Sequence, residues 1–170
     1  MRLVRTEVLI ARGAFAESRE WAQIQDELRT AIRRVVWPPG NNRFTIHPQS
    51  GRRRGEGNGV KPIKDAFVDA LEDFGWEPER RLRIGTVRAA GKIDVIKRTP
   101  RGIFAVEWET GNISSSHRSV NKLALGIIQN AIVGGCIVLP TREMYRYLTD
   151  RVGNFRELEP YFPLWQSVVT

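Results

Sequence analysis

The spacing of apolar residues predicts three amphipathic helices. Apolar side chains recur at three- and four-residue steps between residues 17 and 36, and the run stops at Trp37-Pro38-Pro39-Gly40. The same period marks a stretch that Pro62 opens, at a favoured first helical position, and that Gly75 ends. A third helix is expected over residues 116–133. This spacing is typical of amphipathic helices.

Shorter apolar segments predict strands over residues 81–87, 92–97, 102–108 and 136–139, and residues 3–10 are expected to form either a short strand or an entry segment. Ala90-Gly91 and Thr99-Pro100-Arg101-Gly102 separate the first three of these strands, as in antiparallel hairpins. The later order of strand, helix and strand is a crossover, which expects parallel pairing. The fold class predicted is therefore α/β (α+β): a mixed sheet, meander first and crossover after, with helices on both faces. A helix over residues 142–151 and an aromatic-rich wrap should follow.

Length and composition favour one globular domain over residues 1–170. The chain is 41% hydrophobic and 27% charged, and no window is apolar enough to span a bilayer. A single cysteine, Cys136, excludes an internal disulfide and is expected to be a small buried side chain. With His47 and His117 the only histidines, a zinc site is hard to build. We expect a cytoplasmic protein of a prokaryote or phage.

The charge balance points to an anionic partner. The net charge is +8, and a polyphosphate backbone is the commonest partner of so basic a domain. Residues 38–60 are rich in Gly, Asn and Pro and contain Arg52-Arg53-Arg54. A stretch of this kind is either an arm that orders on nucleic acid or a solvated loop.

Acidic residues on two neighbouring strands suggest a metal site. Glu107 and Glu109 are two residues apart at the end of one predicted strand, so both carboxylates share a face. Hairpin pairing would bring Asp94 of the preceding strand near them. Converging carboxylates repel one another unless a hard cation such as Mg²⁺ binds between them. Scattered solvent-facing acids are the alternative, which the pattern of Asp followed by Glu-x-Glu disfavours.

The same residues resemble the PD-(D/E)xK nuclease signature, in the variant where glutamate replaces the final lysine. The surrounding motifs occur in the order typical of BglII- and BamHI-like type II restriction endonucleases, over roughly residues 17–140. They are Gly59-Val60-Lys61-Pro62-Ile63-Lys64, Gly75-Trp76, Gly91-Lys92-Ile93-Asp94 and Glu107-Trp108-Glu109-Thr110-Gly111-Asn112. Two departures are Ile93 in place of the usual proline and Glu109 in place of the lysine. Lys92, on the strand face of Asp94, is a candidate substitute for that lysine, although an edge lysine is more often solvated.

The resemblance implies cleavage of double-stranded DNA at a specific site. Asp94, Glu107 and Glu109 would bind Mg²⁺, with Mn²⁺ as a possible substitute, and Glu109 would bind metal or activate water. A fourth acid is expected from Glu77 or Glu79, with Glu79 favoured. The residues expected to contact DNA are Arg52, Arg53, Arg54, Lys61, Asn112, Ser114, Ser115, Ser116, Arg118 and Lys122.

Two functional alternatives remain open at this stage. One is a repair or junction-processing nuclease, because a fold does not settle its substrate. The other is a non-catalytic DNA-binding protein with a nuclease-like core.

One acidic cluster cuts one strand, so we expect a homodimer on a twofold-symmetric site, paired through the aromatic tail or an exposed helix face. A serine among Ser114, Ser115 and Ser116 is expected to cap the third helix, and His117 to be exposed or near DNA.

Overall fold

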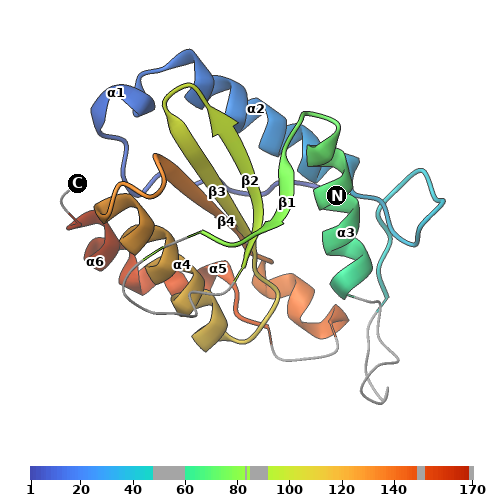
Figure 1. Cartoon of the computed structure of the whole chain (residues 1–170). Helices are drawn as coiled ribbons and strands as arrows, with labels where there is room; N and C mark the ends of the chain where they lie inside the picture. Colours follow the sequence, from blue (N-terminus) through green and yellow to red (C-terminus); the bar gives the residue numbers. More distant parts are fainter. Residues whose placement is uncertain (48–59, 83, 85–91, 149–151, 169–170) are drawn as a thin grey trace.

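A mixed four-stranded sheet lies at the centre of the computed structural model, which describes residues 1–47, 60–82, 84, 92–148 and 152–168 (Figure 1). Its spatial order is β1-β2-β3-β4, with the first three strands antiparallel and β3 parallel to β4. The strands are β1 (Glu77–Arg80), β2 (Ile93–Thr99), β3 (Gly102–Trp108) and β4 (Gly134–Val138). The predicted meander, crossover and fold class are therefore confirmed.

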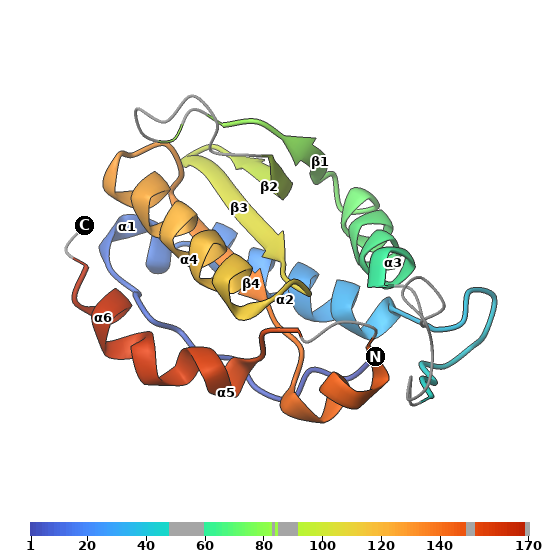
Figure 2. The same ribbon diagram turned by 90° about the horizontal axis from the view of Figure 1, so that it is seen from below.

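Helices cover both faces of the sheet, as Figures 1 and 2 show. One face packs against α2 (Arg19–Arg34) and α3 (Val60–Glu72), and the other packs against α4 (Ile113–Ile128). The short elements are α1 (Gly13–Ala16), the 3₁₀ helix η1 (Arg142–Tyr147), α5 (Phe155–Leu158), the 3₁₀ helix η2 (Glu159–Tyr161) and α6 (Phe162–Gln166). Within the described ranges, no helix combines the length and apolar character needed to cross a bilayer.

Two sets of apolar contacts fix the sheet between its helices. Phe104, Val106 and Trp108 alternate along β3 and pack with the buried stripes of α2 and α3. Ala105 and Ile96 face the other way, toward Leu123 of α4. Because side chains alternate along a strand, this register also turns Glu107 toward α4. The apolar core therefore sets the face on which the carboxylates lie.

The helix ends follow local chemistry, with one correction. Ser18 caps α2 by accepting a hydrogen bond from Trp21 N at 3.2 Å. The cap of α4 is Asn112, whose Oδ1 accepts from Ser115 N at 3.0 Å. The prediction that Ser114, Ser115 or Ser116 caps this helix is wrong. The helix starts three residues earlier than predicted, so the serines lie inside its first turn.

Three predicted elements differ from the structure. The first meander strand is residues 77–80 and not 81–87, of which 83 and 85–87 lie outside the described residues. Leu82 and Ile84 pack in the core beside α4, so their apolar character reflects burial rather than strand pairing. Residues 3–10 form no strand, because Leu3 and Leu9 pack against separate core clusters instead.

The predicted helix over residues 142–151 is the short 3₁₀ helix η1. Leu148 ends it in an extended conformation with its side chain buried. Residues 149–151 lie outside the described part of the chain. The aromatic wrap that was expected beyond them is found: Trp165 is buried against α4, with its Nε1 donating to Asn121 Oδ1 at 2.9 Å.

Candidate active site

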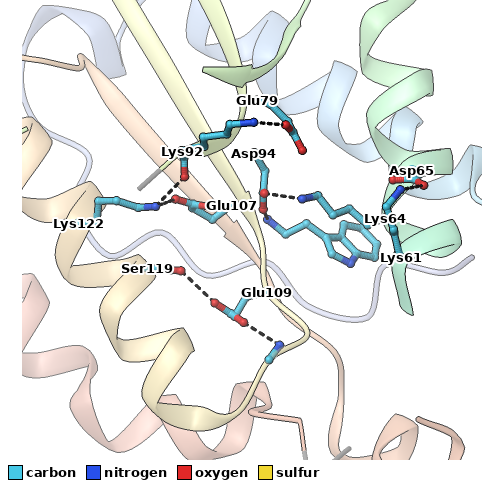
Figure 3. Close-up of polar contacts among 12 residues, drawn as sticks. Lys61, Lys64, Asp65, Glu79, Lys92, Asp94, Glu107, Glu109, Ser119 and Lys122 are labelled. Atoms are coloured by element: carbon cyan, nitrogen blue, oxygen red, sulfur yellow. Dashed lines mark hydrogen bonds and ion pairs between the residues drawn. The ribbon is translucent and has the colours of Figure 1, made fainter. Parts of the chain in front are cut away.

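Asp94 and Glu107 lie side by side on the two central strands (Figure 3). The register pairs Val95 with Val106, so the preceding residue of β2 and the following residue of β3 are neighbours. The Trp108 backbone N–H donates to Asp94 Oδ2 at 2.8 Å, which fixes that carboxylate against β3. Asp94 is half-buried and Glu107 is buried. Two carboxylates are thus held together where the sheet meets α4.

The environment of Glu107 disfavours its charged form. Burial is the largest of the effects that together raise the pKa of Glu107 to about 7; Lys122 opposes it, and the charge and hydrogen bonding of the nearby Asp94 carboxyl act in the same direction as burial. Glu107 Oε1 is buried and, within the described residues, accepts no hydrogen bond of good geometry. Its contact with the Lys122 ammonium is an ion pair. Two neighbouring carboxylates, one of them buried, are an arrangement that a cation would stabilise.

A lysine stands on each side of this carboxylate pair. Lys64 of α3 places its Nζ 2.5 Å from Asp94 Oδ1. Lys122 of α4 pairs with Glu107 and also donates to the Lys92 carbonyl oxygen at 3.0 Å. Figure 3 shows the two lysines approaching from the two helices that flank the sheet. Their charges balance those of the carboxylates across the width of the site.

Glu109 is turned toward α4. Its Oε1 accepts from Gly111 N at 2.7 Å, and its Oε2 accepts from Ser119 Oγ at 2.9 Å; both Glu109 and Ser119 are buried. A Cβ at Gly111 would lie 2.8 Å from Glu109 Oε1, so glycine permits this close approach. Among the described residues, no three His, Cys, Asp or Glu side chains are grouped so as to hold a metal. The structure therefore joins Asp94 with Glu107, while Glu109 is engaged separately.

The two acids of β1 also have cationic partners. Glu79 accepts from Lys92 at 2.6 Å, and this hydrogen bond is the largest cause of its lowered pKa, to which the charges of Lys64 and Lys61 contribute. Its side chain is 60% exposed, so it can change partner at little cost. Glu77 instead pairs with Arg80 and Arg98. Glu79, and not Glu77, therefore lies among the lysines of the site. Lys92 pairs with Glu79 and not with Asp94.

The residues expected to contact DNA divide by exposure. Lys61, Asn112, Ser114 and Arg118 are exposed, Ser115 is half-buried, and Lys122 lies in the site itself. Ser116 is fully buried beneath Gly153, where an added Cβ would meet its Oγ at 2.6 Å. Arg52, Arg53 and Arg54 lie outside the described residues.

Two side chains outside the site have structural contacts. His117 packs edge-on against Tyr161, with ring centroids 4.5 Å apart, and lies 5.6 Å from Trp165. Burial raises the pKa of the Cys136 thiol to about 11, which opposes formation of a thiolate. Cys136 packs on β4 and is half-buried, whereas its sequence context predicted a buried side chain.

Sequence reasoning missed two residues of this site, Lys64 and Ser119. Lys64 is thirty positions from Asp94 in the chain, so only the packing of α3 on the sheet shows their contact. Ser119 could have been found from periodicity, since it is one helical turn before Lys122 and on the same side of α4.

A mixed sheet bearing paired carboxylates at its centre, flanked by lysines, defines a nuclease of the restriction-endonuclease class. The whole chain, residues 1–170, matches the family model described as "Restriction endonuclease BamHI". It is 48% identical over 167 residues to the type II restriction enzyme OkrAI of Oceanobacter kriegii, covering 98% of this chain and 82% of that protein. It is 41% identical over 152 residues to the type II restriction enzyme BamHI of Bacillus amyloliquefaciens, covering 85% of this chain and 70% of that protein.

The chain therefore belongs to the BamHI restriction endonuclease family. Its activity is that of a type II restriction enzyme, a site-specific endodeoxyribonuclease that hydrolyses phosphodiester bonds of DNA. Enzymes of this type generally use divalent metal ions. The family membership confirms the resemblance and the enzyme class inferred from the sequence, and it disfavours a non-catalytic role.

Proposed function

We propose that Asp94 and Glu107 bind a catalytic Mg²⁺ ion that this enzyme uses to cut double-stranded DNA. The observation that supports this most directly is the close carboxylate pair, in which burial of Glu107, together with the nearby Asp94, raises the pKa of Glu107 to about 7. The donor set is made of carboxylate oxygens, which Mg²⁺ prefers and for which Mn²⁺ is a common substitute. When bound, the ion would stabilise negative charge developing on the scissile phosphate and polarise a water.

Glu109 is proposed as the residue that orients the attacking water and accepts its proton. Its two hydrogen bonds, from Gly111 and Ser119, leave a lone pair on each oxygen and restrict the side chain to one orientation. Its hydrogen bonds are to Gly111 and Ser119 and not to Asp94 or Glu107, which favours this role over that of a shared ligand. Glu79 is proposed as a further carboxylate of the site, because Lys92 is its exposed and replaceable partner.

The basic and polar groups around the site would bind the DNA backbone. Lys61 and Arg118 are exposed on α3 and α4, the helices that flank the carboxylates. Asn112 and Ser114 lie at the start of α4, where free backbone N–H groups favour a phosphate. Arg52, Arg53 and Arg54 remain proposed contacts from outside the described residues. Each phosphate contact that is lost should reduce the dependence of affinity on salt.

The site assignment is tested by Asp94→Ala and Glu107→Ala. Either change should abolish plasmid cleavage in Mg²⁺ and in Mn²⁺ while retaining much of the DNA binding, because the basic surface remains. Wild-type protein in EDTA provides the comparison. Cleavage by either variant at close to the wild-type rate would refute the assignment.

The role of Glu109 needs its own variants. Glu109→Gln keeps the shape and both hydrogen-bonding partners but cannot accept a proton, so it should bind DNA and Mn²⁺ and fail to cut. Glu109→Lys restores the commoner residue of the broad superfamily, and substantial cleavage by it would mean that a base at this position is not required. Full activity of Glu109→Ala would remove the residue from the mechanism.

We further propose that the working unit is a homodimer on a twofold-symmetric site. The two interface candidates predicted from sequence lie side by side (Figure 2), joined by the Trp165–Asn121 hydrogen bond. Leu125 and Ile128 of α4 are exposed, as are Tyr161 and Leu164 in the chain's tail region. A second copy that covers these side chains would place two sites on opposite strands of the duplex.

Light scattering of wild-type protein and of Leu125→Glu tests the dimer. The wild type should have twice the monomer mass, and the variant should be a folded monomer that nicks supercoiled plasmid and linearises it slowly. A wild-type monomer on DNA that accumulates only nicked circles would exclude the dimer.

A further inference from the structure

Lys64 is the lysine of the described site that donates its hydrogen bond to Asp94. Its Nζ donates to Asp94 Oδ1 at 2.5 Å, and its side chain is 26% exposed. Lys122 differs, since it pairs with Glu107, donates to the Lys92 carbonyl oxygen and is 15% exposed. Lys64 is therefore held by one bond at the solvent side of the site, and Lys122 is anchored inside it.

The Asp94 carboxylate can lose Lys64 without losing its own position. Its second oxygen accepts the Trp108 backbone N–H, a contact that belongs to the sheet and does not involve Lys64. A cation that takes the first oxygen would repel the ammonium while leaving the carboxylate in place. A lysine has a flexible four-carbon stem, so its ammonium can move to a neighbouring acceptor.

When DNA is bound, the scissile phosphate would be a second anionic acceptor for Lys64. A divalent ion held by Asp94 would stabilise charge on that phosphate, so the phosphate would lie close to Asp94. An ammonium displaced from Asp94 would then be near the phosphate oxygens. In this chain Glu109 occupies the position at which the commoner signature has a lysine. Lys64, on α3, would supply a cation from a different part of the fold.

We propose that Lys64 is a phosphate-binding catalytic residue, held by Asp94 in the free protein and transferred to the scissile phosphate when a divalent cation and DNA bind. This inference rests on the proposed function of Asp94. It gives Lys64 two successive partners of the same charge, a carboxylate and then a phosphate. The charge of the site is thereby balanced both before and after the substrate arrives.

The test uses Lys64→Met, which removes the charge and keeps the length of the side chain, and Lys64→Arg, which keeps the charge. The matched control is Arg34→Met, because Arg34 also pairs with a single carboxylate, that of Asp73, on the same side of the sheet but away from the site. Two quantities are measured: the single-turnover cleavage rate at saturating protein in Mg²⁺, and Mn²⁺ binding to the DNA-free protein by electron paramagnetic resonance.

We expect Lys64→Met to cut about 100-fold more slowly, the usual effect of removing one group that stabilises transition-state charge. It should nevertheless bind Mn²⁺ at least as tightly as wild type, because the competing ammonium is gone. Lys64→Arg should recover most of the rate, and Arg34→Met should match wild type in both measurements.

Two results would overturn the proposal. If Lys64→Met cleaves DNA at the wild-type rate and binds Mn²⁺ more tightly, Lys64 only pairs with Asp94 while no metal is bound and has no role in cleavage. Parallel loss of cleavage and Mn²⁺ binding would mean that it only holds Asp94. Asp94→Asn separates failure of this inference from failure of the site assignment: if that variant binds Mn²⁺ and cuts like wild type, the proposed site itself is wrong.

Discussion

Replacing Glu107 with glutamine should stabilise the metal-free protein while abolishing its activity. An ordinary glutamate has a pKa of 4.5, and burial raises that of Glu107 to about 7. At about 1.4 kcal/mol for each pH unit, ionised Glu107 lowers the free energy of unfolding by about 3 kcal/mol relative to its neutral form. Glutamine resembles the neutral form, so Glu107→Gln avoids this cost at every pH.

The sign of the effect depends on pH in a defined way. A carboxyl whose pKa is higher in the folded state contributes its full stability below pH 4.5 and loses it as the pH rises toward 7. Wild type and Glu107→Gln should therefore be equally stable near pH 4. Above pH 7 the variant should be more stable, by about 3 kcal/mol at most.

Urea unfolding of both proteins in EDTA, at several values between pH 4 and pH 8, measures this difference. Mg²⁺ should then stabilise the wild type and leave the variant unchanged, because only a native state that binds the ion gains from it. The reasoning fails if Glu107→Gln is the less stable protein at pH 8 in EDTA. That outcome would mean that the ion pair with Lys122 outweighs the burial of the charge.

Two further predictions concern packing around and away from the site. Gly111→Ala places a methyl group 2.8 Å from Glu109 Oε1 and should lower the single-turnover rate at least 10-fold, with DNA affinity in a gel-shift assay changed much less. Glu27→Ala removes the buried partner of Lys97, at 3.2 Å, and of Trp76 Nε1, at 2.6 Å. It should lower the free energy of unfolding by about 3 kcal/mol in urea, without changing the cleavage rate of the folded protein. An unaltered rate in the first variant, or unaltered stability in the second, would contradict these assignments.

The sequence predicted the parts of the fold that a strong apolar period marks. The helix now seen as α2, the β2–β3 hairpin and the crossover to β4 were all anticipated, because their side chains are buried in a regular pattern. β1 was missed for a physical reason. It is an edge strand with charged residues and Pro78, and Ile84, which resembled strand material, packs beneath α4.

The sequence predicted the residues of the candidate site better than it predicted the contacts between them. The pairing of Asp94 with Glu107 follows from hairpin register, which sequence can predict. The orientation of Glu109 depends on Ser119, in the following helix, and the partner of Asp94 depends on where α3 packs. The contact of Asp94 with Lys64 is set by tertiary packing, on which local periodicity carries no information, whereas the side of α4 on which Ser119 lies follows from helical spacing.

The order of the site along the chain has a consequence for recombination between related enzymes. Except for Lys64 and Glu79, the side chains that pair with one another in the site come from the continuous stretch of residues 92–122. Exchange of that stretch as one block would carry the Glu107–Lys122 and Glu109–Ser119 pairs together. A recombination point between Glu109 and Ser119 would instead combine a glutamate and a serine from two different enzymes, in which the pair has not evolved together. The resulting chimaeras should fold and yet lose cleavage.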